Sequence, residues 1–286
     1  MPELPEVQAL TDFLATRLAG RAITGVELGS ISVLKTFDPP PSALVGAPVT
    51  GVARRGKFID IDCGGTHFVT HLARAGWLRW SEKAPATRLR PGRSPIELRM
   101  RFDDGSGFDL TEAGTHKRLA AYLVHDVADV PGVASLGPEP LDDTFTLGVF
   151  AGILAGNRVQ LKGLLRNQGI IAGIGNAYSD EILHVAKLSP FALASSLEES
   201  TVERLYAALR DTLSAAVAAA SGRPAAELKD AKRAGMRVHG RTGQACPVCG
   251  DIVREVSFAD SSLQYCPRCQ TGGKPLADRR TSRFLK

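Results

Sequence analysis

The sequence has no long apolar run, and no stretch approaches the roughly 18 residues that would span a bilayer. Its start, Met1-Pro2-Glu3-Leu4, lacks the basic and then apolar order of a signal peptide. An internal repeat is also absent, and a composition of 44% hydrophobic and 23% charged residues excludes disordered, collagen and coiled-coil classes. We therefore expect a soluble intracellular protein whose 286 residues form one large or two ordinary domains.

The chain also lacks a strong excess of charge of one sign, since 35 Lys and Arg against 30 Asp and Glu give +5. The excess is concentrated near the end of the chain. Residues 221–286 hold 13 basic and 6 acidic side chains, whereas residues 1–220 hold 22 and 24. A cationic end on a near-neutral body indicates a polyanionic partner. A solvated, partly disordered basic tail explains the charge alone equally well.

The N-terminal half is predicted to be a β-sandwich or barrel behind one helix. Short strands with turn residues between them run from about residue 22 to 125, most clearly in the alternating stretch 96–102, and residues 103–107 follow it as a hairpin loop. The helix precedes them. Its apolar residues at helical spacing, and the glycine that ends it, are Val7, Leu10, Phe13, Leu14, Leu18 and Gly20.

Proline and glycine interrupt both periodicities at residues 131–142, which we interpret as a linker between a domain at 1–130 and a helical domain at 143–238. Ser196 with Glu199 has the spacing of a capping box ahead of an apolar helical stripe. We therefore predict a long helix starting there.

Four of the five cysteines are spaced as Cys246-Pro-Val-Cys249, then 16 residues, then Cys266-Pro-Arg-Cys269. This spacing predicts one structural Zn²⁺ in a ribbon at residues 239–270, because each Cys-x-x-Cys turn directs two thiolates at one point. Redox pairs or disulfides are the alternatives, and a reducing cytosol disfavours them. The ribbon lies in the most basic part of the chain, so nucleic acid is the leading partner, with protein contacts as the other reading. Cys63 is expected to be structural.

A glycine-punctuated turn at residues 170–176 separates predicted helices at 161–165 and 177–185. Asn176 would begin the second helix, whose free N–H donors suit a phosphate. Tight helix packing explains the glycines equally well.

With these elements placed, the chain resembles the formamidopyrimidine-DNA glycosylase and endonuclease VIII family. The resemblance covers nearly the whole length and implies an α+β fold of two domains. These are an N-terminal β-sandwich with an N-terminal helix, and a C-terminal helical domain with a helix-two-turn-helix motif and a β-hairpin zinc finger. The matching motifs are Met1-Pro2-Glu3-Leu4-Pro5-Glu6-Val7, Arg54-Arg55-Gly56-Lys57-Phe58, His71-Leu72, Leu136-Gly137-Pro138-Glu139-Pro140-Leu141, Gly173-Ile174-Gly175-Asn176-Ala177-Tyr178 with Glu181, and Gly240-Arg241 with the four cysteines.

The resemblance implies a bifunctional DNA glycosylase and abasic-site lyase of base-excision repair. Removal of Met1 would free the secondary amine of Pro2, which attacks the sugar C1′, expels the base and forms a Schiff base. A proline iminium has no nitrogen proton to lose, so it remains an electron sink and drives strand cleavage by β,δ-elimination. Family resemblance assigns proton transfer at the sugar to Glu3, supporting charge near the amine to Glu6, and a DNA-directed hairpin cation to Lys57.

The DNA-binding residues implied by the resemblance are His71, Arg74, Lys117, Arg118, Leu119, Lys162 and Asn176. Two of the positions depart from the family pattern. Arg74 replaces the methionine that fills the gap left by the extruded nucleotide, and Lys117-Arg118-Leu119 replaces the Arg-Arg-Phe wedge. We expect Arg74 to fill the gap by stacking, and recognition of the opposite base to differ.

Two further departures concern the substrate. Ser261 stands where the family's zinc hairpin has a phosphate-gripping arginine, and Arg254, Arg268 or Lys274 would have to substitute for it. Residues 221–238 lack the long loop that caps 8-oxoguanine. Oxidised pyrimidines, ring-opened purines and abasic sites are therefore expected substrates ahead of 8-oxoguanine. The tail at 271–286 either adds backbone contacts or is disordered, the second being slightly favoured.

The expected partner is double-stranded DNA with damaged or abasic nucleotides, bound by a monomeric, cytoplasmic, nucleoid-associated protein that does not bind membranes. The main alternative is a protein that binds damaged DNA with little glycosylase turnover. A zinc-ribbon module serving protein assembly would require the N-terminal motif to be incidental.

Overall fold

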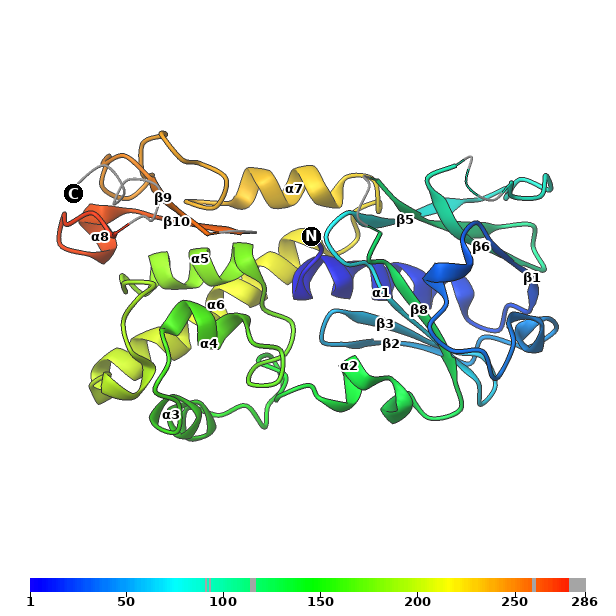
Figure 1. The fold of residues 1–286 in the computed structure, drawn as a ribbon, viewed down its shortest axis with the longest axis horizontal. Helices are drawn as coiled ribbons and strands as arrows, with labels where there is room; N and C mark the ends of the chain where they lie inside the picture. The colour runs from blue at the N-terminus through cyan, green and yellow to red at the C-terminus, as the bar shows by residue number, and fades with distance from the viewer. Residues whose placement is uncertain (91, 93, 114–116, 259–260, 278–286) are drawn as a thin grey trace. The chain divides into compact units, whose positions relative to one another are not determined.

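The computed structural model describes residues 1–90, 92, 94–113, 117–258 and 261–277. The chain divides into two compact units, and the first combines Met1–Leu136 with Ala220–Lys229. The second combines Gly137–Ala219 with Asp230–Lys286. Strands dominate the first unit and helices the second (Figure 1), so the predicted two-domain α+β fold is confirmed. Within the described part of the chain, every helix is too short or too polar to cross a membrane.

The first unit is a helix backed by two antiparallel four-stranded sheets. One sheet has the order β1-β6-β7-β5 and the other the order β2-β3-β4-β8. The bounds are α1 Leu4–Leu18, β1 Ile23–Leu28, β2 Gly51–Arg55, β3 Phe58–Asp62, β4 His67–His71, β5 Gly76–Ser81, β6 Ile96–Phe102, β7 Gly107–Glu112 and β8 Ala120–Val124. Short helical turns lie at η1 Ile31–Val33, η2 Pro41–Leu44, η3 Val127–Asp129 and α2 Pro131–Ala134.

One hydrophobic cluster joins α1 to both sheets. The predicted apolar stripe of α1 is buried in it, with Leu10 and Leu14 fully inaccessible. Ile59 and Phe68 enter the cluster from one sheet, and residues of β6 and β7 enter it from the other. Because both sheets turn an apolar face inward onto the same core, the arrangement is a sandwich rather than an open sheet.

A short segment from late in the chain completes the first unit. Trp77 donates its indole N–H to the carbonyl of Ala225 over 3.1 Å, and the ammonium of Lys229 lies 4.4 Å from the Trp77 ring. Ala220 and Leu228 belong to the same core cluster as α1. The sequence prediction places this stretch in the helical domain, and no local pattern signals its return to the sandwich.

The second unit is built from helices and one β-hairpin. Its elements are α3 Leu147–Ala155, α4 Leu161–Arg166, α5 Asn176–Val185, η4 Ala194–Ser196, α6 Glu199–Ala220, α7 Leu228–Gly235, β9 Arg254–Ser257, β10 Ser262–Tyr265 and α8 Pro267–Gln270, with the ends of α6 and α7 crossing into the first unit. Phe145, Phe150 and Tyr206 form an aromatic cluster with ring centroids 5.8 to 6.2 Å apart. The predicted pair of helices around a turn is present as α4 and α5.

The predicted capping box ahead of the long helix does not form. Ser196 lies in η4, and its hydroxyl donates to the Leu193 carbonyl over 3.0 Å instead of reaching the helix. The helix α6 starts at Glu199, whereas a helix capped by Ser196 would start at the residue directly after Ser196. The serine hydroxyl therefore forms a hydrogen bond within the local 3-10 turn and not with the start of the helix.

Candidate functional site

The N-terminal residues are held by the start of α1. Glu3 is the N-cap of this helix, and its backbone N–H donates to Glu6 Oε2 over 2.9 Å within a capping box. Both carboxylates are only 2% exposed, and Pro2 is buried beside them. A proline in the first helical turn, Pro5, fits the same start because it has no N–H to leave unpaired. The backbone next to Pro2 is thus fixed by a buried acceptor.

Lys57 lies in a two-residue turn between β2 and β3, where Arg55 pairs with Phe58. Gly56 has φ +55°, which a hairpin turn of this length requires and glycine adopts without strain. Arg54 connects this turn to α1, since its Nε donates to Gln8 Oε1 over 2.8 Å and its Nη1 to the Gly56 carbonyl over 3.0 Å. Arg54 belongs to the Arg54-Arg55-Gly56-Lys57-Phe58 motif, but no sequence pattern predicts that it braces this turn.

His71 ends β4 directly across from Phe58, and the two rings lie 4.7 Å apart. Burial, with the nearby positive charge of Lys57 as a second cause, lowers the pKa of His71 to about 4. The imidazole is therefore neutral at physiological pH. Its Nδ1 accepts the N–H of Ala73 over 3.3 Å, so the remaining proton is on Nε2 and is available to a phosphate or sugar oxygen.

Arg74 is exposed in the tight turn between β4 and β5. Ala73 has φ +50°, a left-handed conformation that is unusual for a residue with a side chain. The turn is closed by the Gly76 N–H, which donates to the Leu72 carbonyl over 2.9 Å. A Cβ at Gly76 would lie 2.1 Å from that carbonyl oxygen, so glycine is required there. The side chain of Arg74 is presented by a rigid turn.

The predicted wedge residues are placed differently from one another. Lys117 pairs with Glu97 Oε1 over 2.9 Å, and Arg118 is exposed. Leu119 is 3% exposed and belongs to the sandwich core, while its backbone N–H and that of Arg118 donate to the buried Glu112 carboxylate. The expectation that Leu119 contacts DNA is not supported by its position, because its side chain packs inward.

In the second unit, Asn176 begins α5 after a turn in which Gly173 has φ +81°. Its Nδ2 donates to the Ser262 carbonyl over 2.7 Å, and its Oδ1 is buried with no partner among the described residues. Gln168 braces the turn, since its side chain accepts from the Gly173 N–H and donates to the Ile174 carbonyl. Neither Gln168 nor Ser262 was singled out by a sequence pattern.

Lys162 is 5% exposed and lies in an ion pair rather than at the surface. Its Nζ donates to Asp180 Oδ1 over 2.6 Å and to the Asn176 carbonyl over 2.7 Å, and Asp180 Oδ2 pairs with His239 Nδ1 over 2.7 Å. A direct contact between Lys162 and phosphate is therefore not supported. Its contacts instead hold the first turn of α5.

Glu181 ties α5 to the segment that leads into the zinc ribbon. Its carboxylate accepts the backbone N–H groups of Arg237, Val238 and His239 over 2.7 to 2.9 Å. Burial nevertheless raises the pKa of Glu181, and these three hydrogen bonds oppose the rise. The motif residue Glu181 is thus an internal anchor.

The four predicted ligand sulfurs converge. Cys246 and Cys269 have their sulfurs 3.9 Å apart, and Cys249 and Cys266 have theirs 3.4 Å apart. A tetrahedral zinc site with Zn–S bonds of about 2.3 Å places its sulfurs roughly 3.8 Å apart. The donor set therefore fits one structural Zn²⁺. A ring nitrogen of His184 lies within 4.8 Å of the sulfurs of Cys246, Cys266 and Cys269, which no sequence spacing predicts.

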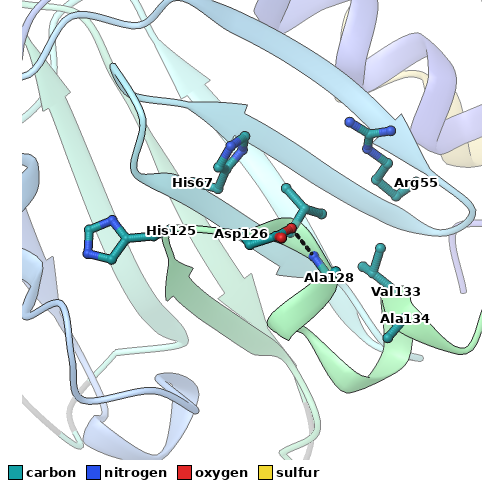
Figure 2. A pocket seen from close by; sticks show the side chains of 8 residues that line it. Arg55, His67, His125, Asp126, Ala128, Val133 and Ala134 are labelled. Carbon is teal, nitrogen blue, oxygen red and sulfur yellow. Dashed lines mark hydrogen bonds between the residues drawn. The ribbon is translucent and has the colours of Figure 1, made fainter.

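A pocket of about 520 Å³ lies elsewhere in the first unit, between Arg55 of β2, His67 of β4 and residues of η3 and α2 (Figure 2). Arg55 and His67 line it, and both pair with the buried Asp60, over 3.4 and 2.8 Å. Asp126 caps η3 through the Ala128 N–H over 2.8 Å. None of the predicted catalytic residues lines this pocket, so we do not assign the chemistry to it.

Comparisons with known proteins match three segments of the chain. Residues 1–117 match the formamidopyrimidine-DNA glycosylase N-terminal domain, residues 136–225 the formamidopyrimidine-DNA glycosylase H2TH domain, and residues 243–272 the zinc finger found in FPG and IleRS. The first match contains the N-terminal proline, both glutamates and Lys57. The third contains all four zinc-site cysteines.

Individual relatives agree with these matches. An uncharacterized formamidopyrimidine-DNA glycosylase-like protein of Mycobacterium tuberculosis is 58% identical over 160 residues, which are 56% of this chain and all of that protein. The formamidopyrimidine-DNA glycosylase of Symbiobacterium thermophilum is 35% identical over 94% of this chain and 89% of its own length. The solved structure of Lactococcus lactis formamidopyrimidine-DNA glycosylase bound to DNA with an abasic site has a TM-score of 0.81 and 26% identity, covering 94% of this chain and 99% of that chain.

Proposed function

Because this chain belongs to the formamidopyrimidine-DNA glycosylase family, we propose that it removes oxidised bases from DNA and cleaves the strand at the resulting abasic site. The observation that supports this most directly is the construction of the N-terminus. Pro2 is followed by the buried pair Glu3 and Glu6, and the Glu6 carboxylate fixes the backbone of Glu3. A nucleophile on a chain end needs such a support, since a free terminus would lose its orientation.

The proposed reaction begins once Met1 has been removed. The nitrogen lone pair of Pro2 attacks C1′, and the electron pair of the glycosidic bond leaves with the base, which takes up a proton. The nitrogen loses its proton, and the C1′–O4′ bond opens to give a C1′ iminium, with Glu3 supplying the proton that O4′ gains. A base then takes the C2′ proton, the electron pair of the C2′–H bond passes to the iminium, and the resulting enamine expels the 3′ phosphate. Loss of the C4′ proton in the same way expels the 5′ phosphate.

The other predicted residues of the first unit would bind DNA. Lys57 lies in the β2–β3 turn that Arg54 braces against α1, and it is 7% exposed, so its side chain would have to turn outward to reach DNA. The neutral His71 has its Nε2 proton free to donate to the sugar-phosphate backbone, and Arg74 is exposed on a rigid turn as the candidate residue for filling the gap in the duplex. Among the wedge residues, Arg118 is the exposed one and is our candidate there.

In the second unit, Asn176 and the N-terminus of α5 form the proposed phosphate site. The backbone N–H groups at the start of α5 are the donors that would face a phosphate, and the Asn176 side chain is held there because its Nδ2 donates to the Ser262 carbonyl. Lys162 would be a positioning residue, because its Nζ donates to the Asn176 carbonyl and holds the first turn of α5. Arg254 on β9 and Arg268 on α8 are exposed cations of the ribbon. Arg254 pairs with Tyr265, four residues along β10 from Ser261, so it does not take the place of the family arginine directly.

We place oxidised pyrimidines, ring-opened purines and abasic sites ahead of 8-oxoguanine as substrates. Much of the stretch 221–238, where the capping loop would lie, is instead helix α7 and the segment packed on Trp77. The alternative is a damage-binding protein with little turnover, which is favoured by the inward position of Leu119 and by Ser261.

Borohydride trapping on a panel of duplexes separates the two functions. The duplexes carry an abasic site, an oxidised pyrimidine, a ring-opened purine or 8-oxoguanine, and undamaged duplex is the control. Covalent adducts on the first three support the proposed enzyme. No adduct on any duplex, together with tight and salt-sensitive binding to damaged DNA, supports the binding protein.

A further inference from the structure

His184 lies on α5 and reaches the cysteine cluster from outside the zinc ribbon. Its side chain is 2% exposed, and its Nε2 lies 3.3 Å from Cys246 Sγ. Among the described His, Asp and Glu residues, His184 is the one whose side chain joins cysteines of this cluster. The contact joins a residue of the helical region to a zinc ligand 62 positions later in the chain.

We propose that His184 is a positioning residue that donates its Nε2–H to the Cys246 thiolate and so fastens the zinc ribbon to α5. The distance of 3.3 Å suits an N–H···S hydrogen bond. Such a bond withdraws electron density from the sulfur and slows its departure from the metal.

The structure favours a donor over a fifth metal ligand for two reasons. The four cysteine sulfurs can fill a tetrahedral set by themselves, since Cys246 Sγ lies 3.9 Å from Cys269 Sγ and Cys249 Sγ lies 3.4 Å from Cys266 Sγ. In addition, Nδ1 of His184 is buried with no partner among the described residues. A ligating Nε2 would place the proton on this nitrogen and bury an N–H without an acceptor, whereas a metal-bound histidine ordinarily donates that proton to a neighbour.

The hydrogen bond attaches the end of α5 to the ribbon, in addition to the contacts that Asp180 and Glu181 make with His239. At its start, Asn176 donates to the Ser262 carbonyl of β10, and eight residues later, about 12 Å along the helix, His184 reaches Cys246. The proposed phosphate site at the start of α5 is therefore built on a helix attached to the ribbon at both ends. Loss of the hydrogen bond from His184 to Cys246 should loosen the metal site without removing a ligand.

The first test is the absorption spectrum of the cobalt-substituted wild-type protein, which requires no variant. The intensity of thiolate-to-cobalt charge transfer counts the bound sulfurs, and the ligand-field bands distinguish four sulfurs from three sulfurs and one nitrogen. We expect a four-thiolate spectrum. A spectrum of three thiolates and one imidazole would make His184 a ligand and overturn the proposal.

The second test is the rate at which zinc passes to a chromogenic chelator. His184→Phe keeps an aromatic ring but removes the donor, and we expect zinc release about tenfold faster than in the wild type. His184→Gln restores an N–H donor and should recover part of the difference. Tyr206→Phe is the control, because it removes one hydrogen bond of the same unit, to the Phe145 carbonyl, far along the chain from the ribbon. Release from His184→Phe at the wild-type rate would contradict the proposal, as would equal acceleration in Tyr206→Phe. Should His184→Phe fail to fold, the cobalt spectrum and the glutamine variant still decide.

Discussion

Glu6 accepts the backbone N–H of Glu3 over 2.9 Å, and this contact is one of the two reciprocal hydrogen bonds that order the residue next to the proposed nucleophile. Glu6→Ala leaves that N–H unpaired in a buried place and removes half of the capping box. We expect the protein to lose about 1 kcal/mol of unfolding free energy and to trap abasic DNA more slowly. Thermal unfolding and single-turnover trapping measure the two effects. Thr16→Ala, at an exposed position of the same helix, should change neither.

Arg54 and Arg55 are adjacent but face opposite sides of β2, which provides a matched pair of variants. Arg54 donates to both Gln8 and the Gly56 carbonyl, whereas Arg55 pairs with Asp60. Lysine cannot span the two acceptors of Arg54, so Arg54→Lys should let the Lys57 turn move and slow trapping by about tenfold. Arg55→Lys should leave the trapping rate unchanged. Equal rates for both variants would argue against a role for Arg54 in positioning this turn.

The pKa of His71, about 4, is below its ordinary value of 6.5, mainly through burial and secondly through the charge of Lys57. The unfolded chain therefore binds a proton at His71 between about pH 6.5 and 4, and the folded protein does not. The contribution of His71 to the free energy of unfolding is therefore full above about pH 6.5, and it falls as the pH is lowered from about 6.5 to 4.

Nuclear magnetic resonance of the ring protons tests this assignment by residue. We expect His71 to stay neutral down to about pH 5, and Lys57→Gln to raise its pKa while leaving it below 6.5, because burial is the larger cause. Titration of His71 near pH 6.5 in the wild type would contradict the assigned environment.

The zinc site should be required for DNA binding because the ribbon supports the start of α5. Cys249→Ser removes one of four ligands, and we expect zinc content and affinity for abasic duplex to fall together. Cys63→Ser is the control, since Cys63 is buried in the sandwich core of the other unit. Metal analysis measures the zinc content, and fluorescence anisotropy at fixed salt measures the affinity for abasic duplex. A zinc-free Cys249→Ser protein with normal affinity would separate the ribbon from DNA binding.

Arg74 is expected to act only where a gap in a stacked duplex must be filled. Arg74→Ala should reduce cleavage of an abasic site more in duplex than in single-stranded DNA. Arg79→Ala, at an exposed position on β5, serves as the charge-matched control. A loss of the same size on both substrates would show that Arg74 contributes general attraction to phosphate instead.

Local patterns in the sequence predicted the parts of the molecule that depend on neighbouring residues. The cysteine spacing predicted the ribbon, the glycines of the turn predicted the α4–α5 pair, and the alternation at 96–102 predicted β6. In each of these cases the geometry is set within a few residues or by a repeated spacing. The family resemblance added the overall domain arrangement.

Contacts between segments that are distant in the chain could not be predicted from the sequence. Lys162 is a charged residue that would be expected at the surface, yet it is buried because it pairs with Asp180, 18 positions away. Leu119 packs inward because the backbone beside it is fixed by Glu112, seven positions earlier. His184 meets Cys246 only after α5 and the ribbon have packed together. Such pairings depend on the tertiary arrangement, which no spacing encodes.

Mass spectrometry of the borohydride-trapped adduct tests whether the Pro2 amine is the nucleophile. The Met1-processed protein is trapped on abasic duplex, digested and sequenced, alongside a preparation that retains Met1. The account predicts an adduct on the nitrogen of Pro2 and none in the preparation that retains Met1. An adduct on a lysine such as Lys57, or equal trapping by both preparations, would contradict it.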